Sequence, residues 1–260
     1  MKTTLPIEFL QPMRVAIVGC GGIGCFLARP LVRFLEYCPL LEDIEIDVYL
    51  IDHDVTTASN LERQSTRNGV GRNKAIHLAS TIEEELSLHR VRVTGLPVAM
   101  TPKQGMKVFK DTFWGNGIIV ASCVDSHKSR VYIQETMAHL NSGILVCGGN
   151  GLHDGQVQIW AKDGGEETAQ IHHAHPEMNS APGRFPDEPS CSNGAVVNPQ
   201  LIWANMACAA IMGTVFWRFV KDGLSPFFHA ESENEVHFDL SECSMKSIRN
   251  PSLIRKGTCS

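Results

Sequence analysis

Residues 14–24 read RVAIVGCGGIG, a β-branched run that passes directly into a glycine loop. Small residues at such a turn let backbone N–H groups approach a phosphate at the N-terminus of the next helix, whose dipole favours negative charge. That helix is predicted by apolar spacing from Ile23 to Leu35, and Pro30 is expected to bend it. The stretch predicts a doubly wound α/β fold. Its candidate nucleotide-binding residues are Gly19, Gly21, Gly22 and Gly24.

Polar side chains follow a second predicted strand, residues 44–51. Asp52 stands at the carboxyl end of this strand, where a carboxylate meets the ribose hydroxyls of a nucleotide. The glycine loop and Asp52 alone favour NAD, because the GxGxxG fingerprint describes sites for that cofactor. Asn60, Arg63 and Lys74 favour a nucleoside triphosphate instead, since attack on a triphosphate needs positive charge around the phosphates.

Four segments, in order along the chain, carry a family resemblance. They are GCGGIG at residues 19–24, IDHDVTTASNLERQ at 51–64, GRNKA at 71–75 and CVDSHKSR at 123–130. Together they closely resemble the adenylation domain of the ThiF/MoeB/ubiquitin-activating E1 superfamily. The resemblance implies a Rossmann-like, doubly wound mixed sheet that binds ATP and magnesium. We expect one ThiF/E1-like adenylation domain over residues 1–240 and a flexible tail over residues 241–260.

Another predicted strand, residues 118–124, ends at Asp125. The resemblance implies a magnesium-binding aspartate here, and a divalent cation that bridges phosphates prefers oxygen ligands. The alternative is that Asp125 only caps the helix that begins near Ser126. Arg130, one turn later, either serves the site or lies on the helix surface. The residues expected on the nucleotide, besides the glycines, are Asp52, Asn60, Arg63, Lys74 and Asp125, and of these we assign catalytic roles to Arg63, Lys74 and Asp125.

Two more predicted strands, residues 144–147 and 156–161, precede a long irregular segment at 162–194. A structureless segment of this length inside a compact domain is usually functional or disordered. The resemblance implies a crossover loop that passes over the substrate tail and carries a nucleophilic cysteine at Cys191. A thiolate near a helix N-terminus attacks an acyl adenylate well. The alternative is that Cys191 is structural.

The nine cysteines include no CxxC pair, so we expect no structural zinc of the kind that many members of the resembled family bind through two such pairs. Five cysteines in apolar segments are predicted to be small core residues. His172, His173 and His175 could in principle hold a metal, but no spaced second element accompanies them. We therefore interpret them as surface histidines of the loop.

The charge balance, 23 basic against 28 acidic residues, argues against nucleic acid or an anionic membrane as a partner. No signal peptide is visible at the start of the sequence, and the odd cysteine count favours a reducing, cytoplasmic setting. Residues 201–220 are nearly long enough to cross a bilayer. Asn205 and Arg218 interrupt or bound this run, so a buried core helix is the preferred interpretation.

Taken together, the residues and the resemblance predict an ATP-dependent adenylyltransferase, an E1-like activating enzyme. Its substrate would be the C-terminal carboxylate of a small ubiquitin-like or sulfur-carrier protein, with thioester formation on Cys191 as a second step and an E2-like or sulfur-donor partner after it. The alternatives are adenylation of a peptide or tRNA-bound carboxylate, an NAD-dependent oxidoreductase, and a catalytically silent scaffold. The resemblance alone implies a homodimer. Relatives usually present an arginine from the partner's N-terminal helix, but the only arginine before the glycine loop here is Arg14, which begins the first predicted strand, so either another arginine replaces it or the dimer is arranged differently.

Overall fold

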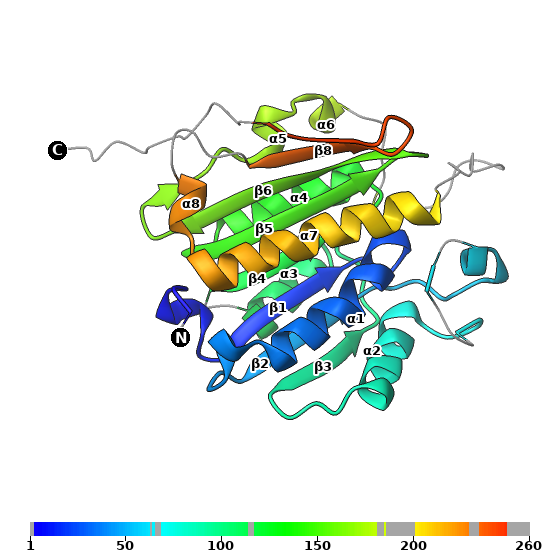
Figure 1. The fold of residues 1–260 in the computed structure, drawn as a ribbon, viewed down its shortest axis with the longest axis horizontal. Coiled ribbons are helices and arrows are strands. Elements are labelled where there is room, and N and C mark those ends of the chain that lie inside the picture. Colours follow the sequence, from blue (N-terminus) through cyan, green and yellow to red (C-terminus); the bar gives the residue numbers. More distant parts are fainter. Residues whose placement is uncertain are drawn as a thin grey trace.

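The computed structural model describes residues 3–62, 64–65, 69–113, 117–180, 185, 201–228 and 234–248. One mixed sheet has the strand order β3-β2-β1-β4-β5-β6-β8-β9, and the short β7 pairs with β6 (Figure 1). The strands are β1 Met13–Val18, β2 Ile46–Ile51, β3 Val91–Leu96, β4 Ile118–Ser122, β5 Ser142–Asn150, β6 Asp154–Asp163, β7 Glu166–Glu167, β8 Glu235–Asp239 and β9 Ser244–Ile248. The α-helices are α1 Gly22–Tyr37, α2 Lys74–Glu85, α3 Gly105–Val108, α4 His127–Ala138, α5 Ile171–Ala174, α6 Glu177–Ser180, α7 Ile202–Asp222 and α8 Ser225–Phe228.

The first five strands are parallel and the later ones are antiparallel. From β1 the chain moves outward through β2 to β3, and then returns to the other side of β1 at β4. The strand order therefore reverses between β1 and β4. In a doubly wound sheet, the carboxyl ends of the strands at such a reversal form the crevice that binds ligands.

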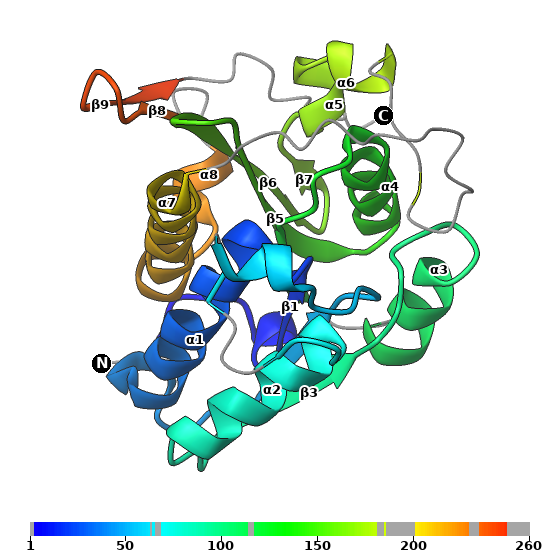
Figure 2. The ribbon, with the colours of Figure 1, turned by 90° about the vertical axis from the view of Figure 1, so that its right-hand side faces the viewer.

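Helices cover both faces of the parallel strands. Figures 1 and 2 show α1, α2 and α7 on one side of the sheet and α3 and α4 on the other. In β1, Val15 and Ile17 join the apolar cluster with α1 and α7, whereas Ala16 and Val18 join the cluster with α4. Because both faces are covered, the central strands β1 and β4 are nearly continuous apolar runs, and this is why they can be recognised in the sequence.

The predicted mixed, doubly wound sheet is confirmed, and so are the strands expected at residues 14–18, 44–51, 118–124, 144–147 and 156–161, within a few residues at their ends. The helix expected after the glycine loop is α1, which continues through Pro30. The strand β3 was not predicted, since its short alternating sequence, VRVTGL, gives only a weak signal.

Two segments that were predicted to be irregular contain helices or strands in the structure. Within residues 162–194, β6 continues to Asp163, and β7, α5 and α6 follow; residues 181–184 and 186–194 lie outside the described residues. In the expected tail, β9 pairs with β8 as an exposed edge strand. Backbone pairing between β8 and β9 therefore orders the first part of that segment, and residues 249–260 are not described.

The long apolar run at residues 201–220 forms α7, which packs against α1, β5 and β6. Its buried residues include Cys208, Met212 and Phe216. Among the described residues, no helix is both long and apolar enough to cross a bilayer.

Candidate functional site

The glycine loop is fixed between β2 and β4 at the carboxyl edge of the sheet. The backbone N–H of Gly19 donates to the carbonyl of Ile51 at 2.8 Å, and that of Cys123 donates to the carbonyl of Val18 at 2.8 Å. Gly19 has a φ of +90°, and a Cβ there would lie 2.8 Å from the carbonyl oxygen of Cys123. A Cβ at Gly24 would lie 1.9 Å from the carbonyl oxygen of Gly19. Only glycine fits these two positions, which keep the loop backbone tight against the strand ends.

Asp52 holds the glycine loop from the end of β2. Its Oδ2 accepts the backbone N–H of Cys20 at 2.7 Å, and its Oδ1 accepts that of Asp54 at 2.8 Å. The side chain is buried, and desolvation raises its pKa although these hydrogen bonds and the charge of Lys74 act to lower it. Each carboxylate oxygen still has a second acceptor position, so ribose hydroxyls could be bound as well.

Lys74 brings a buried ammonium to the same edge. It is the first residue of α2, which Asn73 caps by accepting the N–H of Ile76 at 3.0 Å. The Nδ2 of Asn73 also donates to the carbonyls of Asp52 and Asp54. The Nζ of Lys74 lies 2.8 Å from Oδ2 of Asp54, whose carboxylate is half exposed. The ion pair uses one of three ammonium donors and leaves the others for a ligand.

Asn60 lies in a 3₁₀ turn, Ala58–Glu62, between Asp52 and Lys74 in the sequence. It is buried, and its Oδ1 accepts the backbone N–H of Thr57 at 3.0 Å. The carbonyl of Asn60 accepts the N–H of Gln64 at 2.9 Å. Asn60 thus orders the turn that carries the NLERQ motif, and Arg63 of that motif lies outside the described residues.

Asp125 follows β4 at the edge of the crevice and is exposed. The residue that caps α4 is Ser126, whose Oγ accepts the N–H of Ser129, so the alternative reading of Asp125 as the cap is wrong. Asp125 makes no hydrogen bond or ion pair within the described part of the chain. Its carboxylate oxygens fit the donor type that magnesium prefers.

Arg130 does not lie on the surface of α4. Its side chain is nine-tenths buried and extends to the end of β5, where Nη1 donates to Sγ of Cys147 at 3.3 Å. Of the two positions that the sequence left open for Arg130, the helix surface is therefore excluded.

The cysteines predicted in the core are buried. Burial raises the pKa of Cys20, Cys25, Cys123 and Cys208, in the last case to about 12. These thiols are protonated and poorly reactive at neutral pH. Cys191 lies outside the described residues. The metal-capable cluster found among the described residues is Asp52, His53 and Asp54, which belongs to the crevice itself.

The interpretation of the three histidines as surface residues is wrong for His172. His172 is buried, and His175 lies between two carboxylates, with Nε2 2.9 Å from Glu235 and Nδ1 3.1 Å from Glu177. Only His173 is exposed. The partner Glu235 comes from β8, 60 residues away, so no local pattern could have predicted the contact.

Sequence reasoning assigned no site role to Asp54 or Asn73, which hold Lys74 and join the end of β2 to α2. For Asn73 a signal was available, because an asparagine directly before an apolar periodic run is a preferred helix cap. For Asp54 the ion pair spans 20 residues and is visible only in the fold.

Residues 7–251 match the model of the ThiF family. Two similar curated proteins are the adenylyltransferase and sulfurtransferase UBA4 of Meyerozyma guilliermondii, 27% identical over 84% of this chain and 46% of that protein, and the adenylyltransferase and sulfurtransferase MOCS3 of Xenopus laevis, 25% identical over 92% of this chain and 47% of that protein. The chain thus spans about half the length of these relatives. A similar solved structure is that of E. coli MccB with ATP, with a TM-score of 0.61 and 16% identity over 96% of this chain and 68% of that one. This likeness supports the fold.

Proposed function

Because the chain belongs to the ThiF family, we propose that it is an ATP-dependent adenylyltransferase that activates a carboxylate. The observation that carries the proposal is the buried ammonium of Lys74, brought by α2 and Asp54 to the edge that also holds the glycine loop and Asp52. A dinucleotide oxidoreductase has no leaving pyrophosphate and so no need for this charge, whereas displacement at a triphosphate does.

The proposed reaction is displacement at the α-phosphorus of ATP. A carboxylate oxygen of the substrate forms a bond to this phosphorus, the bond to the bridging oxygen of pyrophosphate breaks, and no proton has to move. Two anions approach each other, so the site must supply positive charge. In the proposal Lys74 and Arg63 stabilise the phosphates, Asp52 binds ribose, and Asn60 orders the turn between them. Asp125 would hold magnesium, which would neutralise phosphate charge.

We propose the C-terminal carboxylate of a small ubiquitin-like or sulfur-carrier protein as the substrate. The names of the relatives UBA4 and MOCS3, adenylyltransferase and sulfurtransferase, support a sulfur-carrier substrate. Transfer of the acyl group to Cys191 as a thioester, and then to an E2-like or sulfur-donor partner, stays a proposal beyond this one. A free peptide or a tRNA-bound carboxylate is the second substrate class to test.

The test combines nucleotide binding with pyrophosphate exchange. The protein should bind magnesium-ATP in a calorimetric titration and show no binding of NAD. Exchange of labelled pyrophosphate into ATP should require an acyl substrate, tried first as a carrier protein that ends in Gly-Gly. Lys74→Ala and Asp125→Asn should each reduce exchange about 100-fold or more, as loss of one group that stabilises transition-state charge does.

Lys107→Ala and Asp111→Asn are matched controls. They remove the same kinds of charge from an exposed ion pair on α3 and the turn after it, away from the crevice. Exchange rates that fall equally in the controls and the site variants, or binding of NAD in place of ATP, would contradict the proposal.

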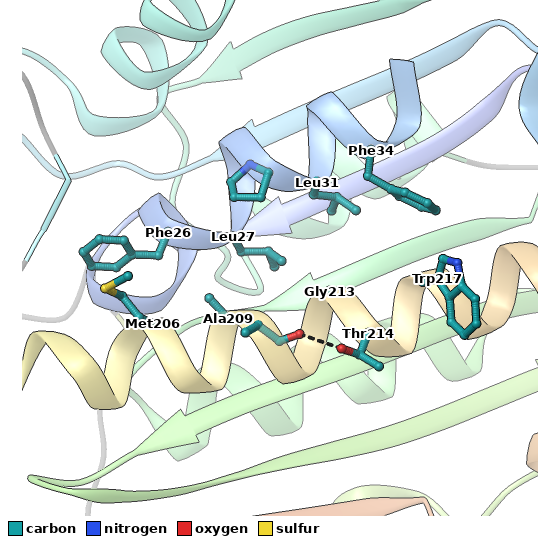
Figure 3. Close-up of a pocket in the computed structure, with 11 residues that line it drawn as sticks. Phe26, Leu27, Leu31, Phe34, Met206, Ala209, Gly213, Thr214 and Trp217 are labelled. Carbon is teal, nitrogen blue, oxygen red and sulfur yellow. Dashed lines mark hydrogen bonds between the residues drawn. The ribbon is translucent and has the colours of Figure 1, made fainter. Parts of the chain in front are cut away.

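We propose further that a second copy of the chain covers the groove between α1 and α7. The groove has a volume of about 540 Å³ and is lined by apolar residues such as Phe26, Leu31, Phe34 and Met206 (Figure 3). The 21 residues of α7 extend for about 31 Å, and two helices side by side, each about 10 Å wide, offer a surface of roughly 600 Å². This is about three quarters of the roughly 800 Å² that each partner buries in a standard interface. Trp203 and Trp217, 65% and 45% exposed, extend the apolar surface along α7.

Light scattering after gel filtration tests this proposal. The wild type should elute as a dimer, and Met206→Glu should shift it toward the monomer. Met245→Glu, at an exposed methionine on the edge strand β9, is the control that should leave the mass unchanged. A wild-type monomer at micromolar concentration would exclude the dimer.

A further inference from the structure

Within the part of the chain that the structure describes, Arg130 is a buried cation without a counter-ion. Its side chain is 9% exposed, and no carboxylate lies within 4.0 Å of its guanidinium in the described residues. Among the described residues, its side-chain partner is the thiol of Cys147, and its Nε has no hydrogen-bond partner there. A guanidinium stays charged in proteins and offers five N–H donors, so most of its binding capacity is unused.

The fold gives no reason for this arrangement. Burying a charge with only a thiol beside it is unfavourable, and an apolar side chain of similar volume would be the more stable choice. A buried charge without a charged partner among the described residues points to a ligand, here one of negative charge that completes the pairing when it binds.

The position of Arg130 relative to the glycine loop follows from the strand register. Val18, which precedes Gly19, pairs with Ser122, and Ser122 pairs with Cys147. Neighbouring strands are about 4.8 Å apart, so the backbone of Cys147 lies about 10 Å from the end of β1. A single phosphate cannot contact both the glycine loop and Arg130 across this distance. Two anions side by side can.

The guanidinium packs against the carboxyl end of β5. A Cβ at Gly149 would lie 2.8 Å from Nη1 and 2.9 Å from Nη2, so the absence of a side chain there lets the guanidinium lie directly against the strand end. Asp125 lies in the loop between β4 and α4, directly before the capping Ser126, and Arg130 lies in the first turn of α4. The guanidinium is thus placed on the β5 side of the proposed metal ligand, and Lys74 lies on the β2 side.

We propose that Arg130 binds the carboxylate of the acyl substrate and holds it beside the α-phosphate. The proposal rests on the adenylyltransferase function and names the residue that receives its second substrate. A planar guanidinium binds a carboxylate through two parallel hydrogen bonds, which fixes the attacking oxygen in orientation. The carboxylate in turn supplies a counter-ion that the described residues do not provide.

The experiment separates substrate binding from a structural role. The variants are Arg130→Met and Arg130→Lys. The control is Arg218→Met, which removes a guanidinium of α7 that lies over the ring of Phe227 in α8. The nucleotide probe is α,β-methylene-ATP with magnesium, followed by calorimetry. The carboxylate probe is N-acetylglycylglycine, followed by saturation-transfer NMR on the nucleotide complex, and its neutral amide is the matched ligand.

The wild-type complex should bind the acid and not the amide. Arg130→Met should weaken acid binding about tenfold or more, as loss of hydrogen bonds to a charged group does, and leave nucleotide affinity within about threefold. Arg130→Lys should retain part of the binding. Because a buried unpaired charge has been removed, the Tm of Arg130→Met should be unchanged or about 2–4 °C higher.

Three results would overturn the assignment. They are equal acid binding by Arg130→Met and wild type, no acid binding by the wild-type nucleotide complex, and a Tm and nucleotide affinity that fall together in Arg130→Met while Arg218→Met is unaffected. Failure of the wild type to bind α,β-methylene-ATP would instead refute the adenylyltransferase function, and the nucleotide titration alone distinguishes the two.

Discussion

Replacement of Asp52 tests how the glycine loop is held. In Asp52→Ala, the backbone N–H groups of Cys20 and Asp54 lose the carboxylate that accepts from them at 2.7 and 2.8 Å. A hydrogen bond to a charged group contributes about 1.5–3 kcal/mol, so two together contribute about 3–6 kcal/mol. Desolvation raises the pKa of Asp52, which means that burying its charge offsets part of the stability that the two hydrogen bonds contribute. The loss of unfolding free energy in Asp52→Ala should therefore lie near the lower end of this range, at about 3 kcal/mol.

Asp52→Asn should lose about half as much unfolding free energy as Asp52→Ala. Its amide keeps one acceptor oxygen for one backbone N–H, but it turns its own N–H donor toward the other backbone N–H. Urea unfolding followed by circular dichroism at neutral pH measures both variants. For a chain of this size, about 3 kcal/mol corresponds to a midpoint lower by about 1 M urea at unchanged slope. Asp111→Ala, an exposed carboxylate, is the control. Midpoints for Asp52→Ala and the control that agree within error would refute this account of the loop.

Three further predictions concern charge and thiol chemistry. Lys74→Met should lower magnesium-ATP affinity about tenfold or more in calorimetry, since it removes a charged donor from the crevice, and an unchanged affinity would place the phosphates elsewhere. Burial disfavours the charged form of His175, but its two carboxylate partners outweigh burial and raise its pKa above the ordinary 6.5. The ion pairs of His175 therefore stabilise the fold fully below pH 6.5, and this contribution is lost as the pH rises through the raised pKa. In urea unfolding, the loss of stability in His175→Gln relative to the wild type should thus be largest in acid, and a loss that does not change with pH would contradict this. Ellman's reagent should react quickly with the exposed Cys243 and negligibly with the buried Cys208, and mass spectrometry of labelled peptides would detect the reverse order.

The sequence predicts the parallel part of the fold well because its signals are local. The β-branched runs at β1 and β4 are buried on both faces, and the glycines at 19–24 and Asp52 follow strands directly. The antiparallel part was predicted less completely, since β7 is a two-residue strand of glutamates and β9 is an exposed edge strand with no apolar alternation toward a core. Each pairs with the strand before it across a short turn, but without a buried face neither segment gives a clear strand signal.

Site residues show the same division. Asp52 was predicted from its place at a strand end, but its bond to Cys20 spans 32 residues and its structural role could not be read from the sequence. The counter-ion of Lys74 and the burial of Arg130 also depend on tertiary packing. Sequence patterns therefore identified which residue types gather at the edge, and the fold was needed to show which of them are already paired.

That division between paired and unpaired charges bears on which residues act on a substrate. Asp52 and Lys74 each have partners in the described structure, so part of their contribution is to stability, and their replacement will affect both folding and binding. Asp125 is exposed, and an exposed carboxylate with no partner among the described residues costs the fold little. Arg130 differs from all of these, because its charge is buried and the described residues offer it no counter-ion. A variant that gains stability and loses substrate at the same position would therefore separate function from folding at Arg130 more cleanly than at any of the paired residues.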